Sequence, residues 1–311
     1  MVLAAYNEAP TIEQTIASFH EALPEAGVFV IDNNSSDSTA RIANETLCAL
    51  DCAGGVIAEP RQGKGNAVRR AFTEIDADVY VLADADMTYP AGRARDLIKP
   101  VLEDRADMVV GNRRAVGRYA EQNKRPLHNV GNRLVGRLVN TLFRSQLDDI
   151  MSGYRAVSRT FAWTYPILVE GFEIETDMTL HALDKRFRVL EIPVEYRDRP
   201  PGSTSKLHTM SDGARVVFTI VQILRYYRPL FFFGAVSLLC LLGALLAGAP
   251  AIRDYITSRY VYHVPLAILA SGLVVVSVMM FGIGLMLDSI AHQQRRDFER
   301  DLVQNRRYAD A

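Results

Sequence analysis

Two aspartates, Asp84 and Asp86, stand one residue apart directly after an apolar run, 79–83, that predicts a buried strand. In an open α/β sheet, ligands bind beyond the carboxyl ends of the strands, and Mg²⁺ takes one or two protein carboxylates together with substrate phosphates. The pair therefore predicts a site for Mg²⁺ or Mn²⁺ that carries a diphosphate. An Asp-x-Asp sequence is also common in solvated loops, so this prediction depends on what accompanies the pair.

Strand-like runs alternate with helical segments over residues 1 to about 110, which predicts an α/β fold with a parallel or mostly parallel sheet covered by helices. The expected strands are 2–5, 28–31, 56–58, 79–83 and 108–110, and the expected helices are 11–23, 38–50 and 65–75. Polar residues come after several strands: Tyr6 and Glu8, then Asp32, then Asp84 and Asp86, then Arg113. Because parallel strands end at one edge of the sheet, these residues together favour a nucleotide site.

Cations accompany the carboxylates. The turn Gly63-Lys64-Gly65 precedes a helix and is suited to anion contact. Arginines surround an amphipathic helix expected at 129–143; most belong to a solvated face, but Arg113 and Arg133 are candidates for holding phosphate, which arginine binds with two donors at once. The Pro/Gly/Ser-rich loop 199–206, with a cation at each end, is expected to act as a lid over phosphates.

The segment after the arginines carries further acids. Asp149 lies in 148–155, and Glu173, Glu175 and Asp177 open a helix expected at 178–185, where acids can serve only to cap the helix. A strand at 189–194 is expected at a sheet edge because it contains a proline.

The last third of the chain has a membrane composition. Of 311 residues with net charge −1, two stretches, 229–252 and 261–287, carry no charged residue over 24 and 27 residues, and each predicts a transmembrane helix. The expected domains are a main domain at 1–210, an interfacial amphipathic helix at 211–228, a two-helix transmembrane hairpin at 229–288 with spans of about 230–250 and 264–287, and a helical tail at 289–311 that could self-associate.

The location of the main domain is predicted from charge and cysteine content. Arg225 and Arg228 precede the first span and Arg295, Arg296 and Arg300 come after the second, so the positive-inside rule places both ends in the cytoplasm. The three cysteines lack zinc-ligand spacing and are expected to be reduced thiols, and no signal peptide is expected.

Over residues 1–210 the motifs stand in one order: Tyr6-Asn7-Glu8, the segment 32–39, Gly63-Lys64-Gly65, Asp84-Ala85-Asp86, Gly111-Asn112-Arg113, Asp149-x-x-Ser152-Gly153-Tyr154-Arg155, and the lysine loop that ends in Ser205-Lys206. In this order they resemble a family 2 glycosyltransferase with the A-type nucleotide-sugar transferase fold, a Rossmann-like mixed sheet. More narrowly, with the C-terminal hairpin, the chain is similar to the polyprenyl-phosphate (dolichol-phosphate) glycosyltransferases that have two transmembrane helices.

The resemblance implies inverting transfer of one hexose from a nucleotide-sugar to polyprenyl phosphate in the cytoplasmic membrane. It implies donor binding by Ala4, Tyr6, Glu8, Asp32, Lys64, Asp84 and Ala85, a metal at Asp84 and Asp86, catalytic roles for Asp86, Asp149 and Glu173, and acceptor-phosphate binding by Arg113, Arg133, Ser205 and Lys206. Asp149 or Glu173 would orient the lipid phosphate or act as a base, and both roles stay open.

The donor is expected to be a UDP-hexose such as UDP-glucose, because Met87-Thr88-Tyr89-Pro90 stands where dolichol-phosphate mannose synthases usually have a Gln-His-Pro type sequence. GDP-mannose is the alternative donor. A processive polysaccharide synthase is disfavoured because the single tryptophan, Trp163, is not in a Gln-x-x-Arg-Trp motif, and a nicotinamide enzyme because the first strand-to-helix turn lacks glycines. The alternative of another class is a non-catalytic membrane scaffold that keeps a degenerate transferase domain.

Overall fold

The computed structural model describes residues 1–115, 126–171, 173–197 and 212–309. The chain divides into two compact units, Met1–Asp212 and Gly213–Ala311.

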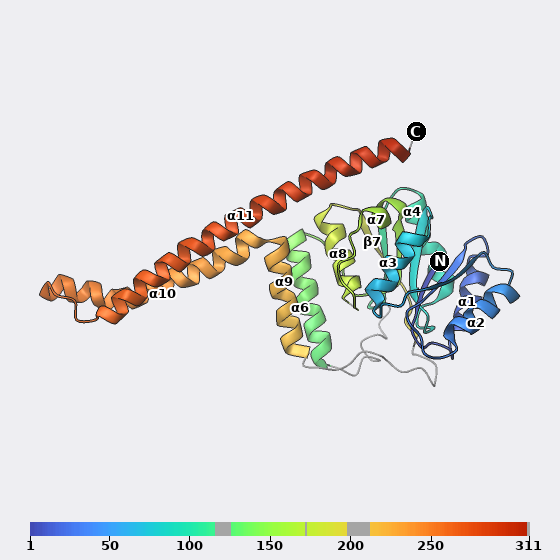
Figure 1. Ribbon diagram of the computed structural model, residues 1–311, viewed down its shortest axis with the longest axis horizontal. Helices are drawn as coiled ribbons and strands as arrows, with labels where there is room; N and C mark the ends of the chain where they lie inside the picture. The colour runs from blue at the N-terminus through green and yellow to red at the C-terminus, as the bar shows by residue number, and fades with distance from the viewer. Residues whose placement is uncertain (116–125, 172, 198–211, 310–311) are drawn as a thin grey trace. The chain divides into compact units, whose positions relative to one another are not determined.

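The first unit is built on a seven-stranded sheet in the order β3-β2-β1-β4-β6-β5-β7 (Figure 1). The strands are β1 Val2–Ala5, β2 Val28–Asp32, β3 Gly54–Ala58, β4 Val79–Asp84, β5 Met108–Asn112, β6 Arg155–Ser158 and β7 Val189–Pro193. β6 is antiparallel to β4 and β5, and the other neighbours pair in parallel. The mostly parallel sheet is confirmed, and β7 with its proline lies at an edge as predicted.

Helices cover both faces of this sheet because successive strand residues point to opposite sides. Their bounds are α1 Ile12–Ala22, α2 Thr39–Ala49, α3 Lys64–Glu74, η1 Ala91–Arg93, α4 Ala94–Leu102, α6 Pro126–Phe143, α7 Arg159–Thr164 and α8 Ile174–Asp184. Leu3 and Val81 belong to one buried apolar cluster with α1, α2 and α4, whereas Val2 and Leu82 belong to a second with α3, α7 and α8. The predicted helices within 1–110 are confirmed to within a residue or two.

The second unit contains α9 Asp212–Tyr227 and two long apolar helices, α10 Pro229–Ser258 and α11 Val264–Ala309. α10 and α11 form an antiparallel hairpin in which Ser237 and Ser277 exchange hydrogen bonds, each hydroxyl donating to the other residue's carbonyl at 2.8–2.9 Å. Gly248 lies against Ala270, which lets the helices approach closely.

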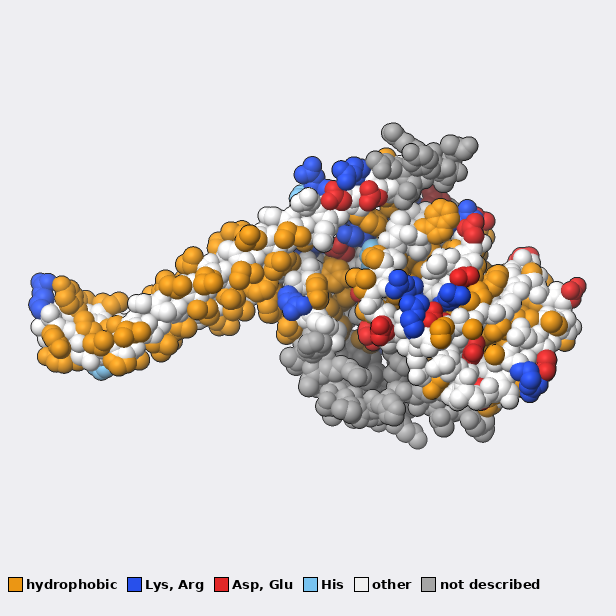
Figure 2. Space-filling view, in the orientation of Figure 1, with side chains coloured by type: hydrophobic (Ala, Val, Ile, Leu, Met, Phe, Trp, Pro, Cys, Tyr) orange, Lys and Arg blue, Asp and Glu red, His pale blue; other side chains and the backbone are white. Residues whose placement is uncertain are grey.

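Both helices are long and apolar enough to cross a membrane, and only 11% of the most apolar window of each is buried. Figure 2 shows hydrophobic side chains over the surface of the hairpin, which distinguishes it from the core helices of the first unit. α11 continues without a break through the charged residues after 287, so the expected tail is an extension of the second span rather than a separate helix. The interfacial position of α9 stays a prediction.

Candidate active site

The carboxyl ends of β1, β2 and β4 lie side by side. Ala4 is in register with Asp84 of β4, and Ala5 is in register with Asp32 of β2. Residues predicted from three separate stretches of sequence therefore meet at one edge of the sheet, which is where ligands bind in folds of this kind. Lys64 reaches the same edge as the first residue of α3.

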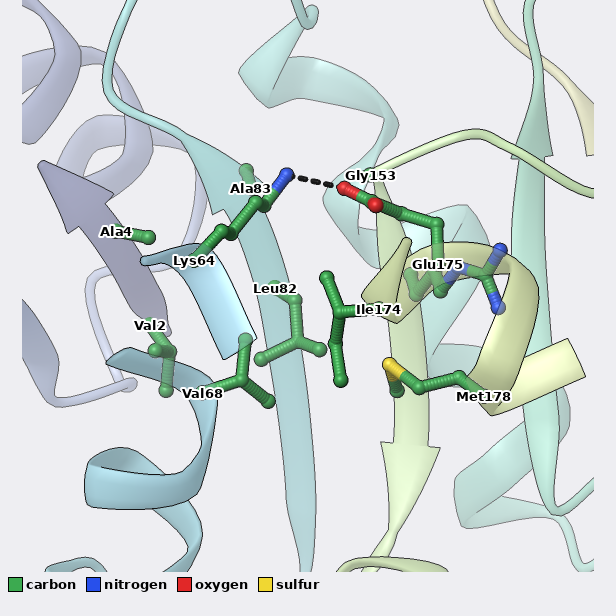
Figure 3. A pocket seen from close by; sticks show the side chains of 11 residues that line it. Val2, Ala4, Lys64, Val68, Leu82, Ala83, Gly153, Ile174, Glu175 and Met178 are labelled. Carbon is green, nitrogen blue, oxygen red and sulfur yellow. Dashed lines mark hydrogen bonds and ion pairs between the residues drawn. The ribbon is translucent and has the colours of Figure 1, made fainter. Parts of the chain in front are cut away.

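Lys64 is held between two carboxylates at this edge. Its Nζ lies 2.5 Å from Asp84 Oδ1 and 2.5 Å from Oε1 of Glu175, which comes from the first turn of α8; Figure 3 shows the contact with Glu175. Burial alone would lower the pKa of Lys64, but the two carboxylates more than offset burial and raise the pKa. The lysine therefore carries its charge at any pH near neutral.

Asp86 is almost fully buried in the turn after β4. Its Oδ1 accepts hydrogen bonds from the Thr88 amide at 3.1 Å and the Thr88 hydroxyl at 2.6 Å, and the intervening Met87 takes a φ of 61° to close the turn. The turn is fixed from the other side by α1, because the carbonyl of Ala85 accepts hydrogen bonds from the hydroxyls of Thr11 and Thr15.

The donor set fits Mg²⁺ or Mn²⁺ when a substrate supplies further ligands. Asp84 and Asp86 offer hard carboxylate oxygens, and magnesium is usually held by one or two carboxylates with the rest of its shell from water and phosphate. Among the described residues there is no group of three or more His, Cys, Asp or Glu that could hold a metal by itself. The arrangement therefore suits a metal that arrives with a diphosphate.

The predicted nucleoside side of the site is formed by two loops tied to each other. The Asn7 side chain accepts the Ser36 amide at 2.8 Å, and the Glu8 amide donates to the Thr39 hydroxyl at 2.9 Å. Asp32 Oδ1 is buried and has no hydrogen-bond partner among the described residues. Since a buried carboxylate oxygen normally has a donor, a nucleoside hydroxyl or N–H would complete it.

In the Gly63-Lys64-Gly65 turn, which was predicted to suit anion contact, the two glycine amides already have partners within the protein. The Gly63 amide donates to Asn33 Oδ1 at 2.7 Å, and the Gly65 amide donates to the carbonyl of Glu170 at 2.9 Å. A Cβ on Gly63 would lie 2.2 Å from that same carbonyl oxygen. The glycines are required because another backbone segment packs directly on the turn, and the lysine side chain alone faces the site.

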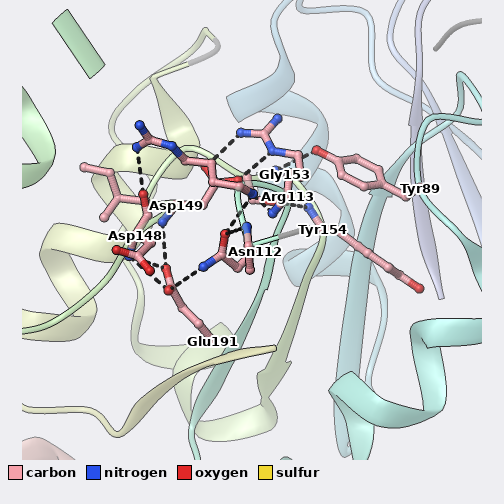
Figure 4. Close-up of polar contacts among 12 residues, drawn as sticks. Tyr89, Asn112, Arg113, Asp148, Asp149, Gly153, Tyr154 and Glu191 are labelled. Carbon is pink, nitrogen blue, oxygen red and sulfur yellow. Dashed lines mark hydrogen bonds and ion pairs between the residues drawn. The ribbon is translucent and has the colours of Figure 1, made fainter. Parts of the chain in front are cut away.

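Arg113, the residue after β5, is one of several arginines predicted near the site. Its Nε and Nη2 donate to the two carboxylate oxygens of Asp149 at 2.7 and 2.9 Å, and both side chains are largely buried (Figure 4). Burial would raise the pKa of Asp149, but the Arg113 guanidinium more than offsets it and holds the pKa below its usual value. One edge of the Arg113 guanidinium is thus occupied by a carboxylate.

Glu191 of β7 holds the residues around the Arg113–Asp149 pair in place through hydrogen bonds. Its carboxylate accepts the backbone amides of Asp148 and Asp149 and the side-chain amide of Asn112, all at 2.8–3.0 Å. Asn112 in turn accepts the amide of Arg114 at 2.9 Å. The ends of β5 and β7 and the 148–149 turn therefore form one rigid support for the arginines (Figure 4).

Arg133 lies beside Arg114 and Arg137 rather than beside Arg113. The three line an open groove of about 360 Å³, together with Ala115, Gly136, Asn140, Leu147 and Asp148. Arg133 is exposed, so its charge is available to a ligand entering this groove. The groove joins the end of β5 to α6 and has three arginines in its lining.

Four other predicted residues, two of which the structure does not describe, add less to the site. Glu173 is exposed at the start of α8, where its carbonyl accepts the Asp177 amide at 2.9 Å. Tyr6 is half-buried near the nucleoside loops. Ser205 and Lys206 fall outside the described residues.

The sequence placed Gly153 and Arg155 in a motif but gave neither of them a role in building the site. A Cβ on Gly153 would lie 2.7 Å from Lys64 Nζ, 3.2 Å from Asp84 Oδ2 and 3.3 Å from the hydroxyl of Tyr89, so only glycine leaves room for these three. Arg155 is fully buried and donates to the carbonyls of Ile150 and Ser152, which shapes the loop that contains Gly153. The signal in the sequence was their place in the motif Asp149-x-x-Ser152-Gly153-Tyr154-Arg155, whereas the close approaches around them appear only in the structure.

Comparison with known proteins agrees with this geometry. Residues 1–165 match the family described as glycosyl transferase family 2. AglJ, a glycosyltransferase of Haloferax volcanii, is 29% identical over 95% of this chain and 94% of its own length. An undecaprenyl-phosphate mannosyltransferase of Micrococcus luteus is 28% identical over 72% of this chain and 92% of its own length.

A solved structure supports the fold. A mannosyltransferase of Pyrobaculum calidifontis, in complex with GDP-Man and Mn²⁺, matches with a TM-score of 0.50 and 16% sequence identity, covering 90% of this chain and 85% of that one. The mixed sheet is that of the A-type nucleotide-sugar transferases, as predicted. Since the family match spans more than half of the 311 residues, this chain belongs to glycosyl transferase family 2.

Proposed function

We propose that this glycosyltransferase moves one hexose from a UDP-hexose, UDP-glucose first among them, to polyprenyl phosphate, giving a polyprenyl-phosphate-linked sugar and a nucleoside diphosphate. The observation that carries the proposal is that two carboxylates suited to a metal diphosphate and an arginine-lined groove lie in one unit of a chain that also has two apolar helices. The similarity to an undecaprenyl-phosphate mannosyltransferase supports the lipid acceptor.

In the proposed reaction a phosphate oxygen of the lipid attacks the anomeric carbon from the face opposite the diphosphate. The new carbon–oxygen bond forms as the bond to the diphosphate breaks, the leaving group takes the electron pair, and the configuration inverts. A Mg²⁺ or Mn²⁺ ion on Asp84 and Asp86 would stabilise the charge that develops on the leaving diphosphate. Lys64 adds a fixed positive charge beside it.

The acceptor needs orientation more than deprotonation. A phosphate monoester has its second pKa near 6, so it is largely a dianion at neutral pH and can attack without a base. We assign acceptor binding to the groove of Arg114, Arg133 and Arg137, because one edge of Arg113 is already occupied by Asp149. Asp149, with its lowered pKa, positions Arg113 in this scheme, and Glu173 is left as the candidate base or orienting group.

We further propose that the chain is an integral protein of the cytoplasmic membrane with its first unit in the cytoplasm. Arginines flank the outer ends of both apolar helices, at Arg225, Arg228, Arg295, Arg296 and Arg300. Homo-oligomer formation through the charged part of α11 belongs to the same proposal.

The test is transfer of labelled sugar into lipid. Purified protein in detergent would be given polyprenyl phosphate, Mn²⁺ and one of UDP-glucose, UDP-N-acetylglucosamine or GDP-mannose, with Asp86→Asn and a chelator as controls. The proposal expects labelled lipid from UDP-glucose, abolished by either control. A product only from GDP-mannose would establish the alternative donor, which the mannosyltransferase relative favours.

A scaffold gives a different pattern. It would transfer nothing from any donor, and its nucleotide binding would be indifferent to metal and to Asp86→Asn. That pattern would refute the proposed reaction while leaving the family assignment in place.

A further inference from the structure

Lys64 already pairs with Asp84, a carboxylate that a metal ion would need as a ligand. Its ammonium contacts Asp84 Oδ1 at 2.5 Å, and Asp84 is one of the two carboxylates suited to the ion. A monovalent cation and a divalent ion cannot both sit against one carboxylate at contact distance without strong repulsion. The contact of Lys64 with Asp84 Oδ1 therefore opposes metal binding at this carboxylate.

The surroundings restrict where the ammonium can go. Below it lies a cavity of only about 20 Å³, whose walls include the apolar side chains of Val68, Leu82 and Met178 (Figure 3). Gly153 closes one side, since its Cα lies so near that an added Cβ would be 2.7 Å from Nζ. An ammonium cannot move into the apolar cavity without losing its partners, which is costly for a buried charge.

Glu175 is the second partner already in place. Its Oε1 lies 2.5 Å from Lys64 Nζ, its side chain is largely buried, and it is held on the inward face of α8 between Ile174 and Met178. Lys64 can therefore leave Asp84 and keep a buried carboxylate partner. An entering diphosphate would add further acceptors on the open side of the site.

We propose that Lys64 and Glu175 make tight divalent-metal binding conditional on nucleotide: Lys64 neutralises Asp84 in the free protein and shifts to Glu175 and the diphosphate when the metal–nucleotide complex enters. Glu175 is then a positioning residue that acts through Lys64. The inference rests on the proposed function only in taking Asp84 as a metal ligand. It also means that return of Lys64 to Asp84 favours release of the metal together with the nucleoside diphosphate.

The test measures Mn²⁺ binding without any transfer reaction. Free Mn²⁺ would be monitored by electron paramagnetic resonance, with the full-length protein in detergent, without nucleotide and with saturating UDP or, in a parallel arm, GDP. For the wild type we expect weak binding of Mn²⁺ alone and a tightening of about tenfold or more with the nucleotide that fits, within the usual range of coupling between two ligands.

Variants of Lys64 and of Glu175 are expected to change Mn²⁺ binding in different ways. Lys64→Met is expected to bind Mn²⁺ alone about tenfold more tightly than the wild type and to lose most of the dependence on nucleotide. Glu175→Gln is expected to keep weak binding of Mn²⁺ alone but to lose most of the tightening, and Glu175→Asp to restore part of it. Arg41→Met removes an exposed positive charge that pairs with the exposed Glu45 instead, and controls for net charge.

A purely structural role for the pair predicts other results. Unchanged or weaker Mn²⁺ binding by Lys64→Met, or an effect equalled by Arg41→Met, would overturn the proposal. If Lys64→Met does not fold, Glu175→Gln decides alone: undiminished nucleotide-linked tightening refutes the proposal. If the wild type transfers sugar to lipid but nucleotide does not tighten its Mn²⁺ binding, this inference is refuted and the proposed function stands. If nucleotide tightens Mn²⁺ binding as expected but no sugar is transferred, the proposed function is refuted and this inference stands.

Discussion

At the scale of single residues, the site depends on close approaches that only particular side chains allow. Gly153 illustrates this, because three polar groups, Lys64 Nζ, Asp84 Oδ2 and the Tyr89 hydroxyl, converge on the position where a Cβ would be. Its amide also donates to the Tyr89 hydroxyl at 3.0 Å. Such a position can be tested with the smallest possible substitution.

Gly153→Ala is expected to lower transferase activity strongly and to destabilise the protein by about 1–3 kcal/mol, as overpacking of a filled site does. The added methyl group must displace Lys64 or Asp84, which the proposed reaction uses. Activity and thermal unfolding in detergent would be measured beside Gly92→Ala, whose Cβ meets nothing within 4 Å. Equal behaviour of the two variants would contradict the assigned crowding.

Arg113→Met and Arg133→Met are expected to have different effects, although both arginines lie near the proposed acceptor-phosphate site. Arg113→Met leaves Asp149 buried without its partner, which should cost about 3 kcal/mol or more of stability and raise the pKa of Asp149. Arg133→Met removes an exposed charge, so its stability should be near that of the wild type while the KM for polyprenyl phosphate rises. Unfolding curves and acceptor titrations would show both effects, and a stable Arg113→Met protein would argue against the buried ion pair. Adding Asp149→Asn to Arg113→Met should recover part of the lost stability.

At the scale of elements, hydrophobic periodicity in the sequence predicted most strands, whereas residues whose place depends on long-range contacts were missed. The alternation of apolar runs located five strands, and the polar residues after them do meet at one edge, as the register of Ala4 with Asp84 shows. β6 was missed because it begins with an arginine, Arg155, whose burial depends on acceptors in the preceding loop and in α8. Glu175 was grouped with capping acids because only the packing of α8 against α3 reveals which acid faces inward.

α8 also carries a buried titratable group on the same inward side as Glu175. Burial, assisted by Lys185 and opposed by Asp184, lowers the pKa of His181 from 6.5 to about 4, and the ring lies among Phe161, Tyr165 and Phe187. Between these two pKa values the unfolded chain binds a proton that the folded chain does not, so stability falls as the pH is lowered from about 6.5 toward 4.

The full effect of this histidine would be about 3 kcal/mol, since each unit of pKa difference is worth about 1.4 kcal/mol. His181→Phe is expected to flatten that part of the curve of unfolding free energy against pH, whatever it does to stability at neutral pH. Denaturant unfolding at several pH values gives the slope for both proteins. An unchanged slope would assign the acid sensitivity to other groups.

At the scale of the whole molecule, the proposed function requires that the first unit and the lipid phosphate be on the same side of the membrane. The polyprenyl chain lies in the bilayer and its phosphate at a surface, so a donor made in the cytoplasm demands that the sheet edge and the arginine groove be cytoplasmic. Charge gives the same orientation, since the arginines near the ends of the hairpin exceed those in its connecting loop, which has Arg253 and Arg259 beside Asp254.

The orientation can be read from the chain's own cysteines. Cys48 is exposed on α2, whereas Cys52 and Cys240 can be replaced by alanine to leave a single thiol. In spheroplasts of an expressing bacterium, a membrane-impermeant maleimide should label Cys48 only after permeabilisation. In a second protein that also carries Cys48→Ala, Tyr260→Cys in the exposed connection between α10 and α11 should be labelled in intact spheroplasts. The opposite labelling pattern would place the first unit outside the cell, where nucleotide-sugars are not made. Labelling of both sites without permeabilisation would mean that the two apolar helices do not cross the membrane as a pair.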